Sequence, residues 1–141
     1  MTEDKYLKER VEDQINWYSK KSAINKKYHL ATRTLVMIFA ALIPFVAGYL
    51  TTENIWLNHY IALLGVLTAV FSGLSVLFKF QEKWSEYRTT SETLKQEKYL
   101  FLTKSGPYDN QEETFKIFVK RIEHLISKEN TAWSQYINKE E

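Results

Sequence analysis

The sequence contains no cysteine, and it has only two prolines and four glycines among its 141 residues. Without cysteine no disulfide can cross-link the fold, which agrees with a reducing compartment. The scarcity of helix breakers and the lack of low-complexity linkers favour long helices in a single domain. The chain is therefore predicted to be all-α.

Basic residues are missing from the middle of the chain. No lysine or arginine lies between Arg33 and Lys79, and Glu53 is the only acidic residue there. Averages over the whole chain, 26% charged residues and a net charge of +2, would suit one soluble helical domain. These averages conceal an apolar middle between two densely charged ends.

Two apolar runs fill this middle, residues 34–50 (TLVMIFAALIPFVAGYL) and residues 61–78 (IALLGVLTAVFSGLSVLF). As a helix each run spans about 26 Å, close to the hydrocarbon thickness of a bilayer. The alternative is a buried hairpin in a soluble bundle, but a chain this short has too few amphipathic residues to cover both runs on every side. The sequence predicts two membrane spans.

Basic residues flank the two runs and are absent from the segment that connects them. Under the positive-inside rule both termini are cytoplasmic and the connecting segment faces outward, as expected for a multi-pass protein of the inner membrane. The first run also begins too far from Met1 for a secretory signal peptide. The flanking basic residues are Lys20, Lys21, Lys26, Lys27 and Arg33 before the first run, and Lys79, Lys83, Arg88, Lys95 and Lys98 after the second.

The expected elements follow from helical periodicity and from stop signals. Apolar positions recur every three or four residues from Leu7 through Tyr18 and again after Phe78. We expect an N-terminal cytoplasmic helix over 5–33, a transmembrane helix over 34–50, an outer turn over 51–57, a transmembrane helix over 58–78, a cytoplasmic extension over 79–104 and a C-terminal helix over 110–138. The cytoplasmic helices are expected to pack as an antiparallel bundle.

Three local features refine these boundaries. Pro44 is expected to bend the first long helix, and the second span is expected to continue past Phe78 without a break. Gly106, followed by a proline, is expected to end that helix. Asp109 and Glu112 then have the spacing of a capping box at the start of the last helix.

Small and polar residues gather on one side of the second span. In lipid the hydrophobic effect cannot sort apolar helix faces by size, so this sorting indicates close approach of another helix. The side consists of Asn58, Ala62, Gly65, Thr68, Ala69, Ser72, Gly73, Ser75 and Lys79, and a strip on the first span consists of Ala40, Ala41, Pro44, Ala47 and Gly48. The candidate helix-packing residues are Ala40, Pro44, Gly48, Gly65, Ala69 and Gly73.

Two arrangements of these strips remain open. They could face each other inside one hairpin, or part of the second strip could surround a central axis in a homo-oligomer. In the second arrangement the candidate pore-lining residues are Asn58, Gly65, Thr68, Ser72, Ser75 and Lys79. Glu53, Asn54 and His59 would then form an outer ring that favours cations, instead of an ordinary hydrophilic turn. Lys79 could also anchor at the headgroups, and the lysines from Lys20 to Lys27 either bind anionic lipid or form a solvated helix face.

No residue pattern points to catalysis. The three histidines are scattered without metal-ligand spacing, and neither a glycine-rich phosphate loop nor a nucleophile elbow is present. Acidic residues balance the basic ones outside the juxtamembrane regions, which argues against nucleic-acid binding. We expect no enzyme activity, no cofactor and no metal, with the lipid bilayer as the main partner.

Three stretches, residues 14–44, 78–108 and 118–136, resemble the SLATT family of bacterial two-transmembrane modules, named for their association with SMODS and SLOG proteins. The residues that carry the resemblance are Trp17, Tyr18, Pro44, Trp84, Tyr87, Arg88, Leu94, Glu97, Glu123, Glu129 and Trp133. The resemblance implies a pore-forming membrane effector of prokaryotic conflict systems, triggered by proteins that make or sense nucleotide signals. Because no sensor domain is fused within these residues, the trigger is expected to act in trans. The alternative function is a non-conducting membrane scaffold that recruits a soluble partner through its cytoplasmic helices.

Overall fold

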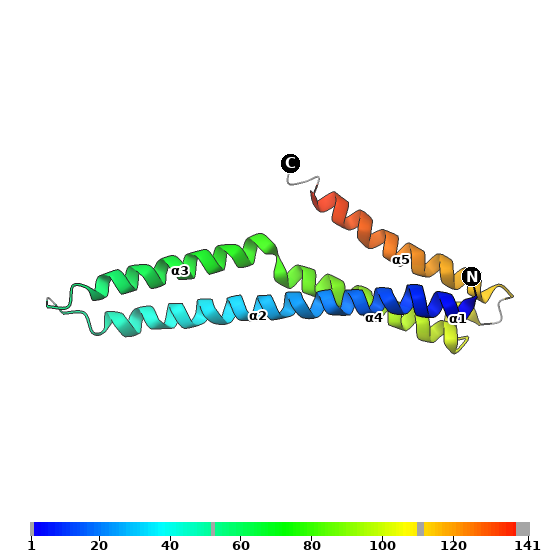
Figure 1. Cartoon of the computed structure of the whole chain (residues 1–141), viewed down its shortest axis with the longest axis horizontal. Helices are drawn as coiled ribbons and strands as arrows, with labels where there is room; N and C mark the ends of the chain where they lie inside the picture. Colours follow the sequence, from blue (N-terminus) through cyan, green and yellow to red (C-terminus); the bar gives the residue numbers. More distant parts are fainter. Residues whose placement is uncertain (1, 52, 110–111, 138–141) are drawn as a thin grey trace. The chain divides into compact units, whose positions relative to one another are not determined.

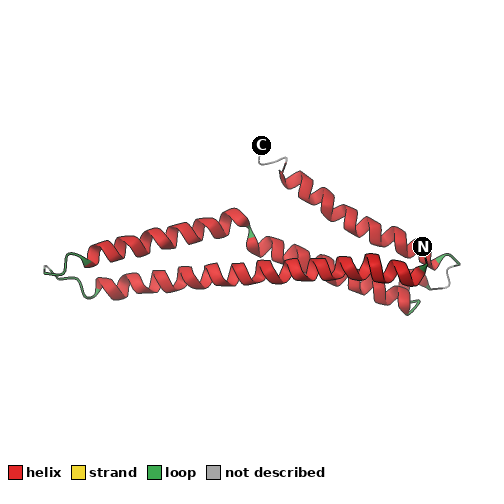
Figure 2. Cartoon of the chain, in the orientation of Figure 1, coloured by secondary structure: helices red, strands yellow, loops and turns green. Residues whose placement is uncertain are grey.

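A computed structural model describes residues 2–51, 53–109 and 112–137, with side chains described as far as residue 128. Every regular element in these ranges is a helix (Figure 2). In chain order they are α1 (Glu3–Tyr6), the π-helix η1 (Leu7–Glu12), α2 (Asp13–Ala47), α3 (Leu57–Phe78), α4 (Phe80–Leu102), the 3₁₀-helix η2 (Gly106–Tyr108) and α5 (Thr114–Ile137) (Figure 1). The predicted all-α class is confirmed, and two of the long helical segments are apolar enough to cross a membrane.

The chain divides into two compact units, where the sequence predicts a single domain. One unit, which we call the bundle, comprises Met1–Ser22 and Ser85–Glu141. The other, which we call the hairpin, comprises Ala23–Trp84. Helix α2 and helix α4 each contribute residues to both units, so the division follows packing and not the ends of the helices.

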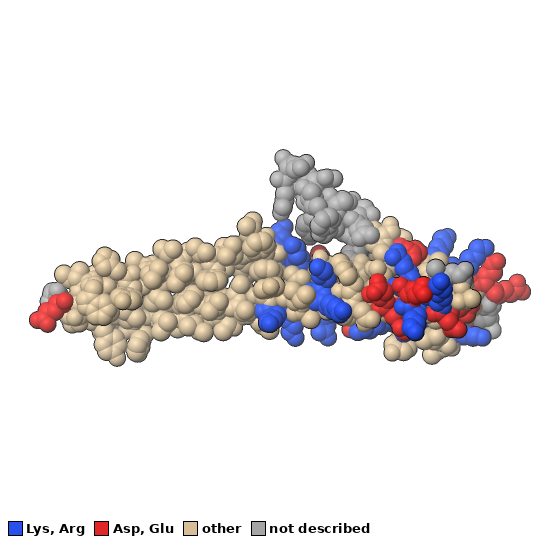
Figure 3. Space-filling view, in the orientation of Figure 1, with Lys and Arg blue, Asp and Glu red and all other residues tan. Residues whose placement is uncertain are grey.

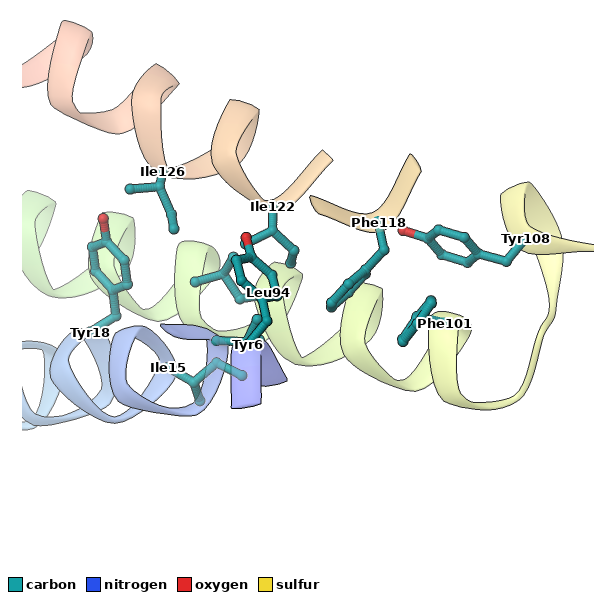
Figure 4. Packing of buried hydrophobic residues seen from close by; sticks show 10 residues of the cluster. Tyr6, Ile15, Tyr18, Leu94, Phe101, Tyr108, Phe118, Ile122 and Ile126 are labelled. Atoms are coloured by element: carbon teal, nitrogen blue, oxygen red, sulfur yellow. The ribbon is translucent and has the colours of Figure 1, made fainter. Parts of the chain in front are cut away.

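The bundle buries one apolar core between η1, the start of α2, α4 and α5. Apolar positions spaced by three and four residues supply one stripe from each helix, as the sequence predicts for residues 7–18. Phe118 and Phe101 stack within this core with ring centroids 4.3 Å apart, and Figure 4 shows the α5 side chains pointing toward the other helices. The buried core residues are Tyr6, Val11, Ile15, Tyr18, Leu94, Phe101, Tyr108, Phe118, Ile122 and Ile126.

The hairpin consists of the second part of α2 running alongside α3 (Figure 1). The half-covered positions of α2 alternate in steps of four and three residues, and most of those of α3 follow the same spacing, which is that of a left-handed supercoiled contact. Phe39 and Phe71 meet across this contact, with ring centroids 5.9 Å apart. The half-covered residues are Asn25, His29, Thr32, Val36, Phe39, Ile43 and Val46 on α2, and Leu57, Ile61, Leu64, Gly65, Leu67, Thr68, Phe71 and Ser75 on α3.

No described residue of the hairpin is fully buried, although its apolar content is far higher than that of the bundle. Phe45 is 62% exposed, Val66 is 59% exposed and Leu77 is 73% exposed. Soluble monomers rarely expose an apolar surface this continuous, whereas lipid provides a suitable surrounding for it. The exposure therefore favours membrane spans over the alternative of a buried hairpin in a soluble bundle.

The predicted unbroken helix from the second span into its extension is wrong. Helix α3 ends at Phe78, Lys79 adopts the left-handed conformation with φ 49° and ψ 39°, and α4 begins at Phe80. A straight helix would turn Phe80 and Trp84 roughly opposite to the contact residues Phe71 and Ser75, because nine residues correspond to about two and a half turns. The break at Lys79 rotates the chain so that Phe80 and Trp84 also pack on α2.

The ends of the other helices differ in detail from the prediction. Gly106 has the expected positive φ of 61°, but α4 already ends at Leu102, and Lys104 is left-handed as well. Helix α5 begins at Thr114, so a capping box at Asp109 is wrong, and Asp109 instead follows η2. Residues 110 and 138, the predicted ends of the last helix, lie outside the described residues. Helix α2 continues through Pro44 to Ala47, and the bend there stays a prediction.

Candidate functional site

The apolar hairpin is the candidate functional site, since it carries all the predicted pore and packing residues. Figure 3 shows a surface free of charge over its spans and lysine and arginine side chains at the end where the apolar runs stop. Glu53, the only charged residue between Arg33 and Lys79, is exposed in the turn between the spans. Among the described residues, no group of three histidine, aspartate or glutamate side chains is placed to hold a metal ion.

The predicted pore-lining residues do not share one environment. Thr68 and Ser75 lie on the side of α3 that faces α2, and both are half-covered. The Thr68 hydroxyl donates to the carbonyl oxygen of Leu64 at 2.8 Å, so this polar group is satisfied within its own helix. That Thr68 and Ser75 line a water path stays a prediction, and within one chain both lie toward α2.

The remaining predicted residues lie mostly on a different side of α3, about a quarter turn or more from the contact with α2. Asn58 and Ser72 are exposed, Gly65 is half-covered, and Lys79 is half-covered at the helix break. A Cβ atom built on Gly65 or Gly73 would meet no atom within 4 Å. The exposed small side chains of α3 are thus open to a neighbour outside this chain.

The two small-residue strips do not face each other within the hairpin. On α2, Ala40 and Pro44 are exposed, as is Gly48 just beyond the helix end. On α3, Ala69 and Gly73 are exposed, and larger residues such as Phe39 and Phe71 make the contact between the helices. The arrangement with facing strips is therefore wrong here, and close packing through these strips stays a prediction for contacts with another chain.

The outer turn satisfies much of its own backbone. The amides of Asn54, Leu57 and Asn58 donate to the carbonyl oxygens of Thr51, Asn54 and Ile55 at 3.0–3.1 Å. His59 is exposed and Asn54 is half-covered, while Thr52 lies outside the described residues. The geometry suits an ordinary hydrophilic turn, and a ring of Glu53, Asn54 and His59 would require several copies of the chain.

A buried carboxylate in the bundle holds α4, η2 and α5 together. Glu97, 7% exposed, accepts a hydrogen bond from the Tyr108 hydroxyl at 2.6 Å. The Arg121 guanidinium binds both oxygens of the same carboxylate, with Nε 2.9 Å from Oε2. These hydrogen bonds, from Arg121 foremost, lower the pKa of Glu97, although burial works in the opposite direction. Burial is the main cause that raises the pKa of Tyr108.

A second carboxylate ties the N-terminus to α5 in the same manner. Glu123 accepts the Tyr6 hydroxyl at 2.9 Å and two hydrogen bonds from Arg10 at 3.0 and 2.9 Å. The Arg10 hydrogen bonds lower the pKa of Glu123, while burial is the main cause that raises the pKa of Tyr6. Neither arrangement follows from sequence spacing, because the partners of Glu123 lie 113 and 117 residues away along the chain and those of Glu97 lie 11 and 24 residues away.

The residues that carry the family resemblance are mainly structural in the bundle. Trp17, Tyr18 and Tyr87 form an aromatic cluster with ring centroids 4.9–6.2 Å apart. Leu94 is fully buried, and the Ser19 and Ser91 hydroxyls lie 2.7 Å apart between α2 and α4. The positions of this set whose side chains lie outside the described residues are Glu129 and Trp133.

These features define an all-helical protein with two membrane-length apolar segments and a helical bundle. The chain belongs to the family described as protein of unknown function DUF4231, whose model matches residues 13–116. That match includes all of α2, α3 and α4, and therefore the whole hairpin. No curated protein and no solved structure matches the chain.

Proposed function

We propose that this protein is an oligomeric membrane channel or pore-forming effector. In this proposal the two apolar helices span the inner membrane, both termini lie in the cytoplasm, and several copies assemble through their hairpins. The protein acts without enzymatic chemistry or a cofactor. A nucleotide-sensing partner triggers it in trans, as the resemblance to SLATT modules of bacterial antiviral defence implies.

The observation that carries this proposal is the uncovered small and polar side of α3. Asn58, Ala69, Ser72 and Gly73 are exposed in a segment that otherwise carries bulky apolar side chains toward the surroundings. Lipid gains nothing from contact with hydroxyl and amide groups, whereas neighbouring helices or water do. Two helices cannot enclose a water path, so a pore requires several subunits.

Two of the predicted pore-lining residues are the best candidates for a central axis. Thr68 and Ser75 lie toward α2, whereas Asn58 and Ser72 are polar and exposed on α3. Both lie on the exposed side, and fourteen residues separate them, about four turns of helix. Gly65 lies between them at the same seven-residue interval and leaves room for a narrow path.

Ion flux from proteoliposomes tests the proposal. We expect flux with the wild-type protein or after addition of the triggering partner, and a loss of at least about tenfold in Ser72→Leu, because a leucine side chain would fill a narrow path. Val66→Leu, which enlarges an exposed apolar side chain on another side of α3, is the matched control and should leave flux unchanged. Glu53→Gln should reduce the preference for cations.

The competing function is a membrane scaffold that does not conduct. The bundle favours it through exposed apolar side chains, since Tyr99 is 63% exposed and Leu102 is 52% exposed on α4. A soluble protein could dock there through contact with these side chains. If the wild-type protein never conducts, while a partner co-purifies with it and is lost in Tyr99→Ala, the scaffold replaces the channel.

A further inference from the structure

A basic collar surrounds the end of the hairpin that is opposite to the outer turn. Within the hairpin, every lysine and arginine lies near this end, and only one acidic residue, Glu82, accompanies them. The collar consists of Lys26, Lys27 and Arg33 on α2, and of Lys79 and Lys83 at the start of α4. It begins where the apolar runs end (Figure 3).

Three of the five basic residues of the collar form no ion pair with a described residue. In the part of the chain that the structure describes, no ion pair engages Lys27, Arg33 or Lys83. Lys27 and Arg33 are exposed and Lys83 is half-covered. Several lysines and arginines of the bundle, by contrast, engage carboxylates, such as Arg10 with Glu123. Basic side chains such as these three, without acidic partners among the described residues, complement an anionic partner.

The backbone break at Lys79 builds one side of the collar. Phe80, the next residue, stacks on Tyr28 of α2 with ring centroids 5.6 Å apart and planes at 24°. Phe78, the residue before, stacks on Phe80 at 5.4 Å and 26°. Because the aromatic rings on both sides of Lys79 are packed in this way, the left-handed residue lies in a packed corner and not in a loose loop.

Trp84 fixes the other side of the collar one turn further along α4. Its indole lies against the His29 ring, with ring centroids 6.4 Å apart, and the Lys26 ammonium lies 5.5 Å from the indole centroid. This cation–π contact holds the Lys26 charge on the collar without neutralising it. Basic side chains from two helices are thereby held within one patch.

We propose that this collar binds the phosphate headgroups of anionic phospholipids. This proposal rests on the placement of the hairpin in the membrane, which is part of the proposed function, but it does not require that the protein conducts ions. With the apolar runs in the hydrocarbon, the collar lies at the headgroup level of the cytoplasmic leaflet, where anionic lipids are found. Lysine and arginine bind phosphate by charge-assisted hydrogen bonds, and the packed aromatic residues position them for it.

Lipid preference in proteoliposomes provides the test. The full chain is reconstituted in phosphatidylcholine, and association of spin-labelled phosphatidylglycerol is compared with that of spin-labelled phosphatidylcholine. The test variant is Lys27→Gln with Arg33→Gln and Lys83→Gln. The matched control is Lys8→Gln with Lys120→Gln and Lys128→Gln, three exposed lysines of the bundle that give the same change in net charge.

We expect the preference for phosphatidylglycerol to fall at least about fivefold in the collar variant and to stay unchanged in the control, since each surface charge near the bilayer contributes about that factor. Equal preference in wild type and collar variant, or an equal fall in both variants, would overturn the proposal. Trp84→Leu should reduce the preference and Trp84→Phe should retain it, with helical circular dichroism as the check on folding.

Ion flux measured on the same vesicles separates this proposal from the proposed function. If the collar variant loses the preference for phosphatidylglycerol while its ion flux is unchanged, the result supports lipid binding by the collar. An unaltered preference in the collar variant overturns the collar and leaves the channel standing. Extraction of the wild-type protein from the vesicles by alkaline carbonate would overturn the membrane placement on which both rest.

Discussion

The bundle and the hairpin have the same spacing of contact residues along their helices, but they differ in how deeply those residues are buried. In both, contact residues alternate in steps of four and three, but the bundle buries Val11, Leu94 and Phe118 completely, whereas no described hairpin residue is buried. The bundle adds ion pairs between helices, and the hairpin presents apolar side chains outward. Periodicity therefore specifies where helices touch, while composition decides whether water or lipid surrounds them.

The largest expected effect is the loss of bundle stability when a core side chain is truncated, and the same truncation in the hairpin is the comparison. Leu94→Ala should destabilise the bundle by about 3 kcal/mol, because it removes a fully buried side chain and leaves a cavity. Leu63→Ala on α3, where the side chain is 55% exposed, should leave the bundle unchanged. Hydrogen exchange of α5 backbone amides in nanodiscs measures the opening of the bundle for both variants. Equal effects would contradict the independence of the two units.

A smaller effect concerns pH and should also be confined to the bundle. The pKa values of Glu97 and Glu123 are lowered in the folded state, so their contribution is complete above the ordinary carboxyl pKa. It is lost as the pH falls below about 4.5 and through the lowered pKa values. Thermal unfolding followed between pH 7 and pH 3 should show the loss.

The variant Glu97→Gln tests the same point at neutral pH. It should lower the free energy of unfolding by about 1–2 kcal/mol. This is less than expected for the loss of a fully buried ion pair, because Arg121 is half exposed. Its unfolding temperature should also depend less on pH than that of the wild type. A matched variant, Glu92→Gln, changes an exposed carboxylate paired only with Lys95 and should have almost no effect. An unchanged pH profile in Glu97→Gln would contradict this role.

The smallest effect is expected at the boundary of the hairpin. Lys79→Gly should stabilise the protein by about 1 kcal/mol or less, because glycine adopts the left-handed conformation without a steric penalty. Lys83→Gly, four residues later inside α4, should destabilise by about 1 kcal/mol, since glycine weakens a helix interior. Chemical unfolding in detergent micelles compares the two. Similar destabilisation by both would mean that residue 79 is helical in solution.

Helical patterning predicted much of this architecture. The recurrence of Val11, Ile15 and Tyr18 identified a stripe that the bundle indeed buries. The second apolar run lies within α3, whereas the first continues three residues past the end of α2 at Ala47. The break at Lys79 was missed, because the residue is neither glycine nor proline. A signal was nevertheless present: the contact positions on the two sides of Lys79 cannot lie on one face of a straight helix.

The candidate site was predicted only in part. Angles around the helix place Thr68 and Ser72 on one side of small residues. In the structure Thr68 is half-covered and Ser72 is exposed, because the contact with α2 is centred near Leu64 and Phe71. Angles around a helix define which residues are neighbours, but not which side a partner occupies. The pairing of Arg10 with Glu123 could not be predicted either, since charge alone does not select among many acidic residues far apart in sequence.

The outer turn has a consequence for how the protein enters a membrane. Its short backbone hydrogen bonds are made within the segment, and its only charged side chain is that of Glu53. In the proposed topology, this turn is the part that must be translocated across the bilayer. Moving one carboxylate and a largely satisfied turn costs far less than moving a folded loop or several basic residues. The two spans are therefore suited to insertion together as a preformed pair during biogenesis.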